Sequence, residues 1–434
     1  MQRIATPALD ARLKRRYLML VESHLHVANA LAAGVSALPG AASAFAATQA
    51  AWRFLNNERV TLPVLVEPLR AVARQRLAGL KTPFVLLVHD WCNLGFDHPR
   101  RKQDLVQLTH DSDVGYELTT ALLVSADDGQ PLAPMEMHLY TGDGVLSTRS
   151  GSSRRQSHLE QVLPTMRAGR KWQLSKPMLH VIDREADSVD HYRRWDAAGE
   201  KFLIRADDRR VRWNDVSCRL SEIAGKLRQQ RAFTCVGTAS YQGRAAQLWV
   251  AETAVVLYRP AKKNVRGRKY EKPGRPLELR LIVVQLRNAA GKLRAQWLLL
   301  SNAPLDWATA ERLAWCYYWR WRIESFFKLL KSHGQQLEQW QQTSGPAIAR
   351  RLLIAAMACV VVWQLQADAS PAAKELKDLL VRLSGRQMKR TRPHTAPALL
   401  AGLWVLLSLL ALLEHYDLRH LKRLATQLPF RDTG

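Results

Sequence analysis

Acidic residues are scarce in this sequence. Its 434 residues include 38 Asp and Glu against 64 Lys and Arg, which gives a formal net charge of +26. The corresponding pI is about 10.3. A positive surplus of this size favours a polyanionic partner, with nucleic acid ahead of an anionic membrane surface.

Cysteine is also sparse, and long uncharged runs are few. The five cysteines are scattered without a Cys-x-x-Cys pair, which argues against a disulfide framework or a zinc site and favours a reducing cytoplasm. Glu22, His24 and His26 interrupt the N-terminal apolar stretch, so a signal peptide is not expected. Residues 396–413 carry no charge and could just cross a bilayer. A helix buried in a helical domain or a dimer interface is the preferred interpretation, and no membrane partner is predicted.

The order of patterns along the chain predicts an α/β fold. Residues 10–75 have helical spacing, whereas FVLLVHDW (84–91), YELTTALLVSA (116–126) and PMEMHLYTG (134–142) are typical of strands. Helical segments then separate PMLHVIDREA (177–186) from KFLIRAD (201–207). Alternation of this kind indicates a mixed sheet. The predicted divisions are an N-terminal helical region (1–75), a core in two parts (76–207 and 301–345) around a β-rich insertion (208–300), and a C-terminal helical region (346–434).

The insertion contains a strongly basic segment, RPAKKNVRGRKYEKPGRP (259–276). It has eight basic residues and one acid, Glu271. Its glycines, prolines and charges predict an exposed β-hairpin tip or loop. A solvated loop is the plain alternative, but phosphate contact is favoured in so basic a chain. The candidate contacts are Lys262, Lys263, Arg266, Arg268 and Lys269.

The segment YYWRWRIESFFKLLKSHG (317–334) places unusual side chains on one helical face. We predict one long helix from an N-cap at Asp306 to Gly334. At about 100° per residue, Tyr317, Arg320, Glu324 and Lys331 fall within a stripe roughly 60° wide. A buried face would not favour these cations, and a solvated face would not need the aromatic rings. The set suits a negatively charged, base-bearing ligand beside a metal-binding carboxylate.

Two aspartates are candidate partners for Glu324. Asp90 and Asp183 each close an apolar strand, at the sheet edge where ligands of open α/β sheets gather. Two aspartates and a glutamate can bridge two Mg²⁺ ions for phosphodiester chemistry. Taken singly, each aspartate could equally be a helix cap or a turn residue.

These motifs resemble the DDE cut-and-paste transposases of bacterial insertion sequences, in the insertion-sequence-four family. The Y-x2-R-x3-E-x6-K signature is matched by the four stripe residues, and the DREAD-like motif stands at 183–187. AAWRFLNN (50–57) is similar to the family's N-terminal region. One departure is that Trp91 and Cys92 follow Asp90, where small hydroxyl residues are expected.

The resemblance implies an RNase H-like core with two Mg²⁺ ions, for which Mn²⁺ can substitute. It implies hydrolysis at the element's end, a DNA hairpin intermediate and joining of the 3′ end to target DNA. By the same resemblance, Tyr317, Arg320 and Lys331 contact phosphate near a flipped base, which stacks on Trp297, with Trp321 and Arg322 in support. Ordinary strand packing is the alternative for Trp297.

The resemblance also implies partners. These are double-stranded DNA, both terminal inverted repeats and target, and a second copy bound through residues 346–434. Residues 8–17 are a candidate end-binding helix, or else a solvated amphipathic one. Two rival functions stay open, namely an RNase H-like nuclease or resolvase without transposition, and an inactive DNA-binding remnant. The expected location is the bacterial cytoplasm, at the nucleoid.

Overall fold

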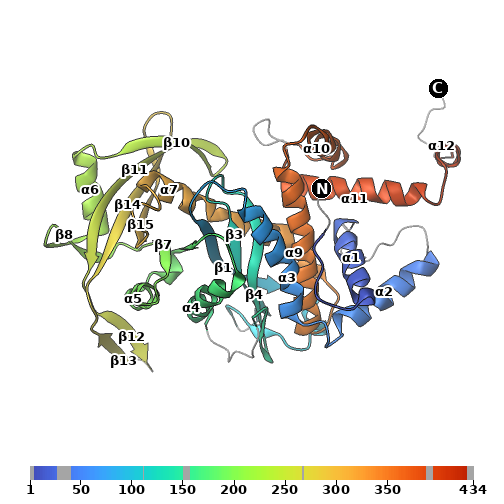
Figure 1. The fold of residues 1–434 in the computed structure, drawn as a ribbon, viewed down its shortest axis with the longest axis horizontal. Coiled ribbons are helices and arrows are strands. Elements are labelled where there is room, and N and C mark those ends of the chain that lie inside the picture. The colour runs from blue at the N-terminus through green and yellow to red at the C-terminus, as the bar shows by residue number, and fades with distance from the viewer. Residues whose placement is uncertain are drawn as a thin grey trace.

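One long twisted sheet organises the chain, and both termini form a helical region at one end of it (Figure 1). The computed structural model describes residues 4–26, 41–110, 112–149, 157–265, 268–387 and 394–427, with the backbone alone for 41–45, 262–265 and 268–269. Within these residues, thirteen strands belong to the large sheet and two more form a separate β-hairpin.

One half of the large sheet, starting from its edge strand β5, has the mixed order β5-β4-β3-β1-β6-β7. Strand β1 pairs antiparallel with β3 and parallel with β6, and β6 pairs parallel with β7. The predicted α/β class, with a large mixed sheet flanked by N- and C-terminal helical regions, is confirmed. The bounds are β1 (Val85–Gly95), β2 (Val106–Gln107), β3 (Val114–Val124), β4 (Pro131–Thr141), β5 (Gly144–Ser147), β6 (Met178–Ile182) and β7 (Lys201–Arg205).

Helices α4 (His158–Gly169) and α5 (Val189–Ala197) connect the central strands. The unit β6-α5-β7 brings two parallel strands side by side, which requires a crossover element. The DREAD-like segment lies between β6 and α5 and forms a short 3-10 turn, η4 (Arg184–Ala186). The chain therefore turns sharply at the carboxyl end of a buried strand.

The inserted strands extend the same sheet, because β15 pairs with β7. Their bounds are β8 (Arg210–Trp213), β9 (Val216–Arg219), β10 (Thr234–Tyr241), β11 (Arg244–Leu257), β14 (Leu277–Arg287) and β15 (Leu293–Ser301), with α6 (Leu220–Gln229) between β9 and β10. The predicted basic hairpin or loop is a β-hairpin of β12 (Ala261–Val265) and β13 (Arg268–Lys272). It projects from the end of β11 (Figure 1).

The segment predicted as one long helix is two helices, α7 (Ala310–Trp319) and α8 (Trp321–Leu330). Thr309, and not Asp306, is the N-cap, since its side chain accepts a hydrogen bond from the backbone N–H of Arg312. Arg320 stands between the helices, where short-range bonds from its N–H to Tyr317 O and from Ile323 N–H to its carbonyl tighten the chain.

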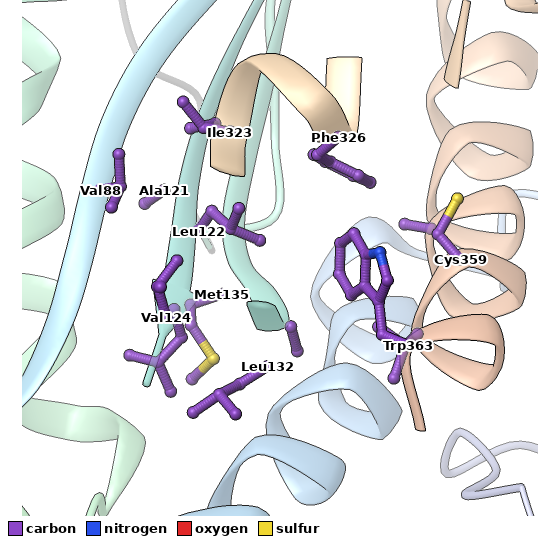
Figure 2. Close-up of a cluster of buried hydrophobic side chains, with 14 of the residues drawn as sticks. Val88, Ala121, Leu122, Val124, Leu132, Met135, Ile323, Phe326, Cys359 and Trp363 are labelled. Atoms are coloured by element: carbon purple, nitrogen blue, oxygen red, sulfur yellow. The ribbon is translucent and has the colours of Figure 1, made fainter. Parts of the chain in front are cut away.

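The helical region is formed from both ends of the chain. Figure 2 shows its contact with the sheet, where Ile323 and Phe326 of α8 and Trp363 of α9 pack over Leu122 and Met135. Burial of these apolar side chains fixes α8, and with it Glu324, against the central strands. The remaining bounds are α1 (Ala11–His26), α2 (Ala41–Leu55), α3 (Leu62–Leu77), α9 (Gly345–Ala367), α10 (Pro371–Leu383), α11 (Ala396–Leu413) and α12 (Leu418–Ala425).

Helices α9 and α11 are both long and apolar enough to span a membrane by length and composition. Helix α9 is a core helix, with 89% of its apolar window buried, whereas α11 has only 22% buried and projects away from the body (Figure 1). At its root, α11 crosses α10 so closely that a Cβ on Gly402 would lie 2.0 Å from the carbonyl oxygen of Leu380. Because only 22% of its apolar window is buried, α11 is not a helix buried within the chain, so that interpretation of residues 396–413 is wrong. The other interpretation, a dimer interface, stays a prediction.

Candidate active site

The two predicted aspartates lie side by side on neighbouring parallel strands. The register of β1 and β6 ends with His89 opposite Ile182, so Asp90 and Asp183 are the next residues on each strand. Asp183 directly follows the last residue of β6, at the strand end where it was predicted. Asp90 lies inside β1, which continues to Gly95 by pairing with β3. The end of β6 therefore leaves one flank of Asp90 open to a third element.

The third element is the junction of α7 and α8, which places Arg320 among the three predicted acids. Its Nη1 lies 2.9 Å from Asp90 Oδ2, and its Nη2 lies 2.8 Å from Glu324 Oε1 and 3.5 Å from Asp183 Oδ2. Arg320 is only 4% exposed. One buried guanidinium thus gathers carboxylates from β1, from the end of β6 and from α8.

The electrostatics of the two aspartates differ. Burial raises the pKa of Asp90 to about 6, against the opposing charge of Arg320, and the charges of Glu324 and Asp183 raise it further. Burial also acts to raise the pKa of Asp183, but Arg320, the N–H of Arg184 and the hydroxyl of Tyr317 together hold it below its usual value. Three carboxylates converge on a single fixed cation, so the cluster has a surplus of negative charge.

The donor set of this cluster fits a hard divalent cation, because all its ligands are carboxylate oxygens. In the part of the chain that the structure describes, no group of three His, Cys, Asp or Glu side chains stands ready to hold a metal ion. We attribute the absence of such a group to Arg320. Its guanidinium forms ion pairs with all three acids and so supplies the positive charge that a metal ion would otherwise supply. A metal ion at these carboxylates would compete with Arg320 for Asp90 Oδ2, Asp183 Oδ2 and Glu324 Oε1.

Tyr317 and Trp297 form the wall beside Asp183. The Tyr317 hydroxyl donates to Asp183 Oδ1 at 2.9 Å. The ring of Trp297 meets that of Tyr317 edge to face, with centroids 5.3 Å apart and planes at 62°. Both side chains are buried, at 4% exposure for Trp297 and 1% for Tyr317. In this conformation Trp297 packs inside the protein, which is the alternative to base stacking given for it in the sequence analysis.

A hollow of about 680 Å³ opens between α8 and the β10–β11 turn. Trp321, which is 46% exposed, and Glu324 line it from α8. Its aromatic and basic lining is of the type that holds a nucleotide base beside its phosphate. The further lining residues include Trp297, Tyr318, Trp319, Arg322, Lys328 and the β10–β11 turn residues Tyr241, Gln242 and Gly243.

Lys331, the last residue of the predicted stripe, lies apart from the acids. It follows the end of α8, and its Nζ lies 2.9 Å from the carbonyl oxygen of Asn93 and 2.9 Å from Glu338 Oε1. Lys331 thus ties the end of α8 to the β1 segment beyond Asp90. The helical projection does not hold here because the helix ends at Leu330.

Sequence reasoning missed a polar network next to the aspartates. The ring of Trp91 stacks on His158 with centroids 4.0 Å apart, and its indole N–H donates to Glu185 at 3.1 Å. His158 also lies 3.0 Å from Glu185 and 3.2 Å from Glu117. This network accounts for the departure at Trp91. In the sequence, Trp91 at an unexpected position and Glu185 within the DREAD-like motif could have pointed to this network. Nothing in the sequence singles out His158.

The predicted basic contacts of the β12–β13 hairpin fall where the structure describes no side chains. Lys262, Lys263, Arg268 and Lys269 belong to its strands, and Arg266 lies outside the described residues. The base of the hairpin is held by α5, since Lys272 Nζ lies 3.5 Å from Asp190 Oδ1.

Comparison with known proteins agrees with this site. The profile of the transposase DDE domain matches residues 141–361, and that of the transposase DNA-binding domain matches residues 9–60. The first match spans more than half of the chain, so the chain belongs to the transposase DDE domain family. Asp183 and Glu324 lie inside that match, whereas Asp90 precedes it and joins the site through its contact with Arg320.

One similar solved structure is a piggyBac transposase synaptic complex with hairpin DNA, at 12% identity and a TM-score of 0.33. The alignment covers 85% of this chain and 63% of that chain, so this chain spans less than two thirds of that transposase's length. No curated protein matches the chain significantly.

Proposed function

We propose that the chain is a DNA transposase that cuts an insertion sequence at its terminal inverted repeats and joins the 3′ ends to target DNA. The observation that carries this proposal is the convergence of Asp90, Asp183 and Glu324 on Arg320. Membership of the transposase DDE domain family and the net charge of +26 support a DNA substrate. The Y-R-E-K and DREAD-like motifs support the insertion-sequence-four family.

Asp90, Asp183 and Glu324 would hold two Mg²⁺ ions, for which Mn²⁺ can substitute. When bound, such ions polarise the phosphodiester and activate water or a 3′ hydroxyl. The chain's own residues position the strand. Arg320, once it releases a carboxylate, can donate to the phosphate, and Tyr317 orients Asp183 through their hydrogen bond.

A DNA hairpin intermediate requires a sharp bend at the cut end. The hollow lined by Trp321, Arg322 and Glu324, with Trp297 at its wall, supports a role in receiving an unstacked base. Lys331 would reach the phosphate beyond that base by exchanging its contact with Glu338.

A second copy of the chain is the proposed protein partner. Helix α11 carries exposed Trp404, Leu409, Leu410 and Leu413, and an apolar face of this kind needs burial. We place the homodimer in the synaptic complex, with the N-terminal helices on the element ends, in the bacterial cytoplasm.

The test is strand cleavage and joining by purified single variants. Asp90→Ala, Asp183→Ala and Glu324→Ala should each abolish Mg²⁺-dependent nicking of end DNA while leaving DNA binding largely intact. Nicking retained by one variant would remove that residue from the site. Cleavage without joining by the wild type would favour a nuclease or resolvase, and binding without cleavage an inactive remnant. The substrate is the DNA flanking the gene, where terminal inverted repeats are expected.

A further inference from the structure

A second basic hollow lies on the inserted strands, just beyond the DREAD-like segment. It has a volume of about 210 Å³. Its lining comes from the start of α5, the β7–β8 connection, the end of β9 and the end of β11. Four arginines contribute to it against one acid, Asp208, and they are Arg209, Arg210, Arg219 and Arg259.

The one acid in the hollow is already engaged. Asp208 accepts hydrogen bonds from the backbone N–H of Ser221 at 2.9 Å and from its hydroxyl at 2.8 Å, at the start of α6. Arg219 lies 3.6 Å from the same carboxylate. Among the described residues, neither Arg210 nor Arg259 has an ion-pair partner. The hollow therefore keeps a net positive charge.

One wall of the hollow is rigid. Arg209 lies 2.6 Å from Asp187, whose side chain is only 1% exposed, and the guanidinium stacks over Tyr192 at 5.3 Å. Val189 opens α5 here, and the hydroxyl of the N-cap Ser188 makes no capping bond. The positive end of a helix dipole adds to the charge of the arginines.

Tyr258 does not line the hollow, but it lies between Leu257 and Arg259, which do, and two of the same arginines act on its hydroxyl. A hydrogen bond with Ser217 lowers the pKa of this half-buried phenol first, and a hydrogen bond from Arg259 and the charges of Arg259 and Arg210 lower it further. An anion at this place would be stabilised by the same groups.

The hollow is close to the cutting site along the chain. Val189 is six residues after Asp183, and six residues reach about 21 Å at most when fully extended. A DNA strand advances about 3.4 Å per nucleotide. A phosphate in this hollow would therefore lie within about six nucleotides of a bond cut at Asp183.

We propose that Arg209, Arg210, Arg219 and Arg259 form a binding site for one DNA backbone phosphate on the duplex that leaves the active site. Guanidinium groups suit phosphate because they offer paired donors in a plane. The DREAD-like segment links this site to the active site. Its first residue, Asp183, belongs to the acid cluster, and its last residue, Asp187, forms an ion pair with Arg209. The site deepens the proposed DNA function and rests on it.

The experiment measures affinity for a random-sequence duplex against salt concentration, without metal. The double variant Arg210→Ala/Arg259→Ala should lower the slope of log affinity against log salt by about 0.9 for each phosphate that the protein no longer neutralises. The variant Arg210→Lys/Arg259→Lys should keep a slope near that of the wild type, because it keeps the charges. The matched control, Arg382→Ala/Arg386→Ala, removes one arginine from the last turn of α10 and one just after that helix and should leave the slope unchanged.

A wild-type slope in the double alanine variant, with an unchanged Tm, would overturn the site. Failure of the wild type to bind any duplex would instead count against the proposed DNA function. Inorganic phosphate, added at constant ionic strength, is a second test of the hollow. It competes for the same guanidinium groups, so it should weaken DNA binding more in the wild type than in Arg210→Ala/Arg259→Ala, and equal weakening in both would show that the hollow does not hold a DNA phosphate.

Discussion

Arg320 Nη1 lies 2.9 Å from Asp90 Oδ2, so a side chain that the sequence predicts for a DNA phosphate is bonded to a predicted metal ligand. The same guanidinium also contacts Glu324 and Asp183. Without DNA or metal, it acts as the cation of the site. Removing one partner of a buried ion pair costs about 3–5 kcal/mol, because the other charges are left uncompensated.

The first prediction concerns competition between Arg320 and metal. Arg320→Ala should lower the Tm of the metal-free protein and should bind Mn²⁺ more tightly than the wild type does, because no guanidinium has to move. At about 100 times its Kd a metal ion adds about 2.7 kcal/mol of stability. The measurements are Mn²⁺ titration by electron paramagnetic resonance and Tm with and without Mg²⁺. Arg322→Ala is the control, and equal Mn²⁺ affinity in the wild type and Arg320→Ala would contradict the competition.

The second prediction separates stacking from packing at Trp297. Flipping a base costs a few kcal/mol and aromatic stacking returns about 1–3. Trp297→Ala should spare the first nick and slow DNA hairpin formation by about tenfold or more. Its Tm should also fall, since Trp297 is buried against Tyr317. Gels that resolve nicked, hairpin and broken ends measure the two rates.

Trp321→Ala is the matched variant for this test, because Trp321 lines the same hollow but is 46% exposed. Its Tm should stay close to that of the wild type. If Trp297→Ala slows nicking and hairpin formation equally, Trp297 serves only the packing of the strand.

The third prediction concerns the β12–β13 hairpin. Deleting residues 262–272 should flatten the dependence of DNA affinity on salt, because the slope falls by about 0.9 for each phosphate left without a basic partner. The large sheet should survive, since these two strands pair only with each other in the described structure. An unchanged slope would show that the hairpin does not touch phosphate.

The fourth prediction is a pH dependence at His158. Burial acts to lower its pKa, but hydrogen bonds and charges from Glu117 and Glu185 outweigh burial and raise it above 6.5. A raised pKa in the folded state contributes stability that is present below about pH 6.5 and lost as pH rises through the folded value. The Tm advantage of the wild type over His158→Gln should therefore shrink between acidic and alkaline pH. A constant difference would exclude charge as the cause.

The fifth prediction concerns the exposed face of α11. Leu410→Glu/Leu413→Glu should shift the protein towards monomer and reduce paired-end complexes, because charges would then enter the apolar interface. Sedimentation velocity with and without DNA measures the state of association. Leu305→Glu is the control, since Leu305 is 73% exposed in the segment before α7. A wild-type distribution in the double variant would remove α11 from the dimer interface.

Sequence alone determined the order of elements and the positions of the two aspartates in the acid cluster. Apolar runs ending in Asp90 and Asp183 placed both carboxylates on strands, and register then set them side by side because parallel neighbours align residue by residue. The basic β-hairpin was equally predictable, since turn residues and charge act locally.

Only the tertiary structure decided which charged side chains contact one another in the site. The predicted stripe assumed one straight helix, but the chain tightens at Arg320 and ends its helix at Leu330, so Lys331 is separated from the acids. The burial of Trp297 depends on Tyr317, which is distant in sequence, and the exposure of α11 depends on what the rest of the chain leaves uncovered. Periodicity reports which face of an element is apolar, whereas the partner of each polar side chain is set by packing between elements that are far apart in the chain.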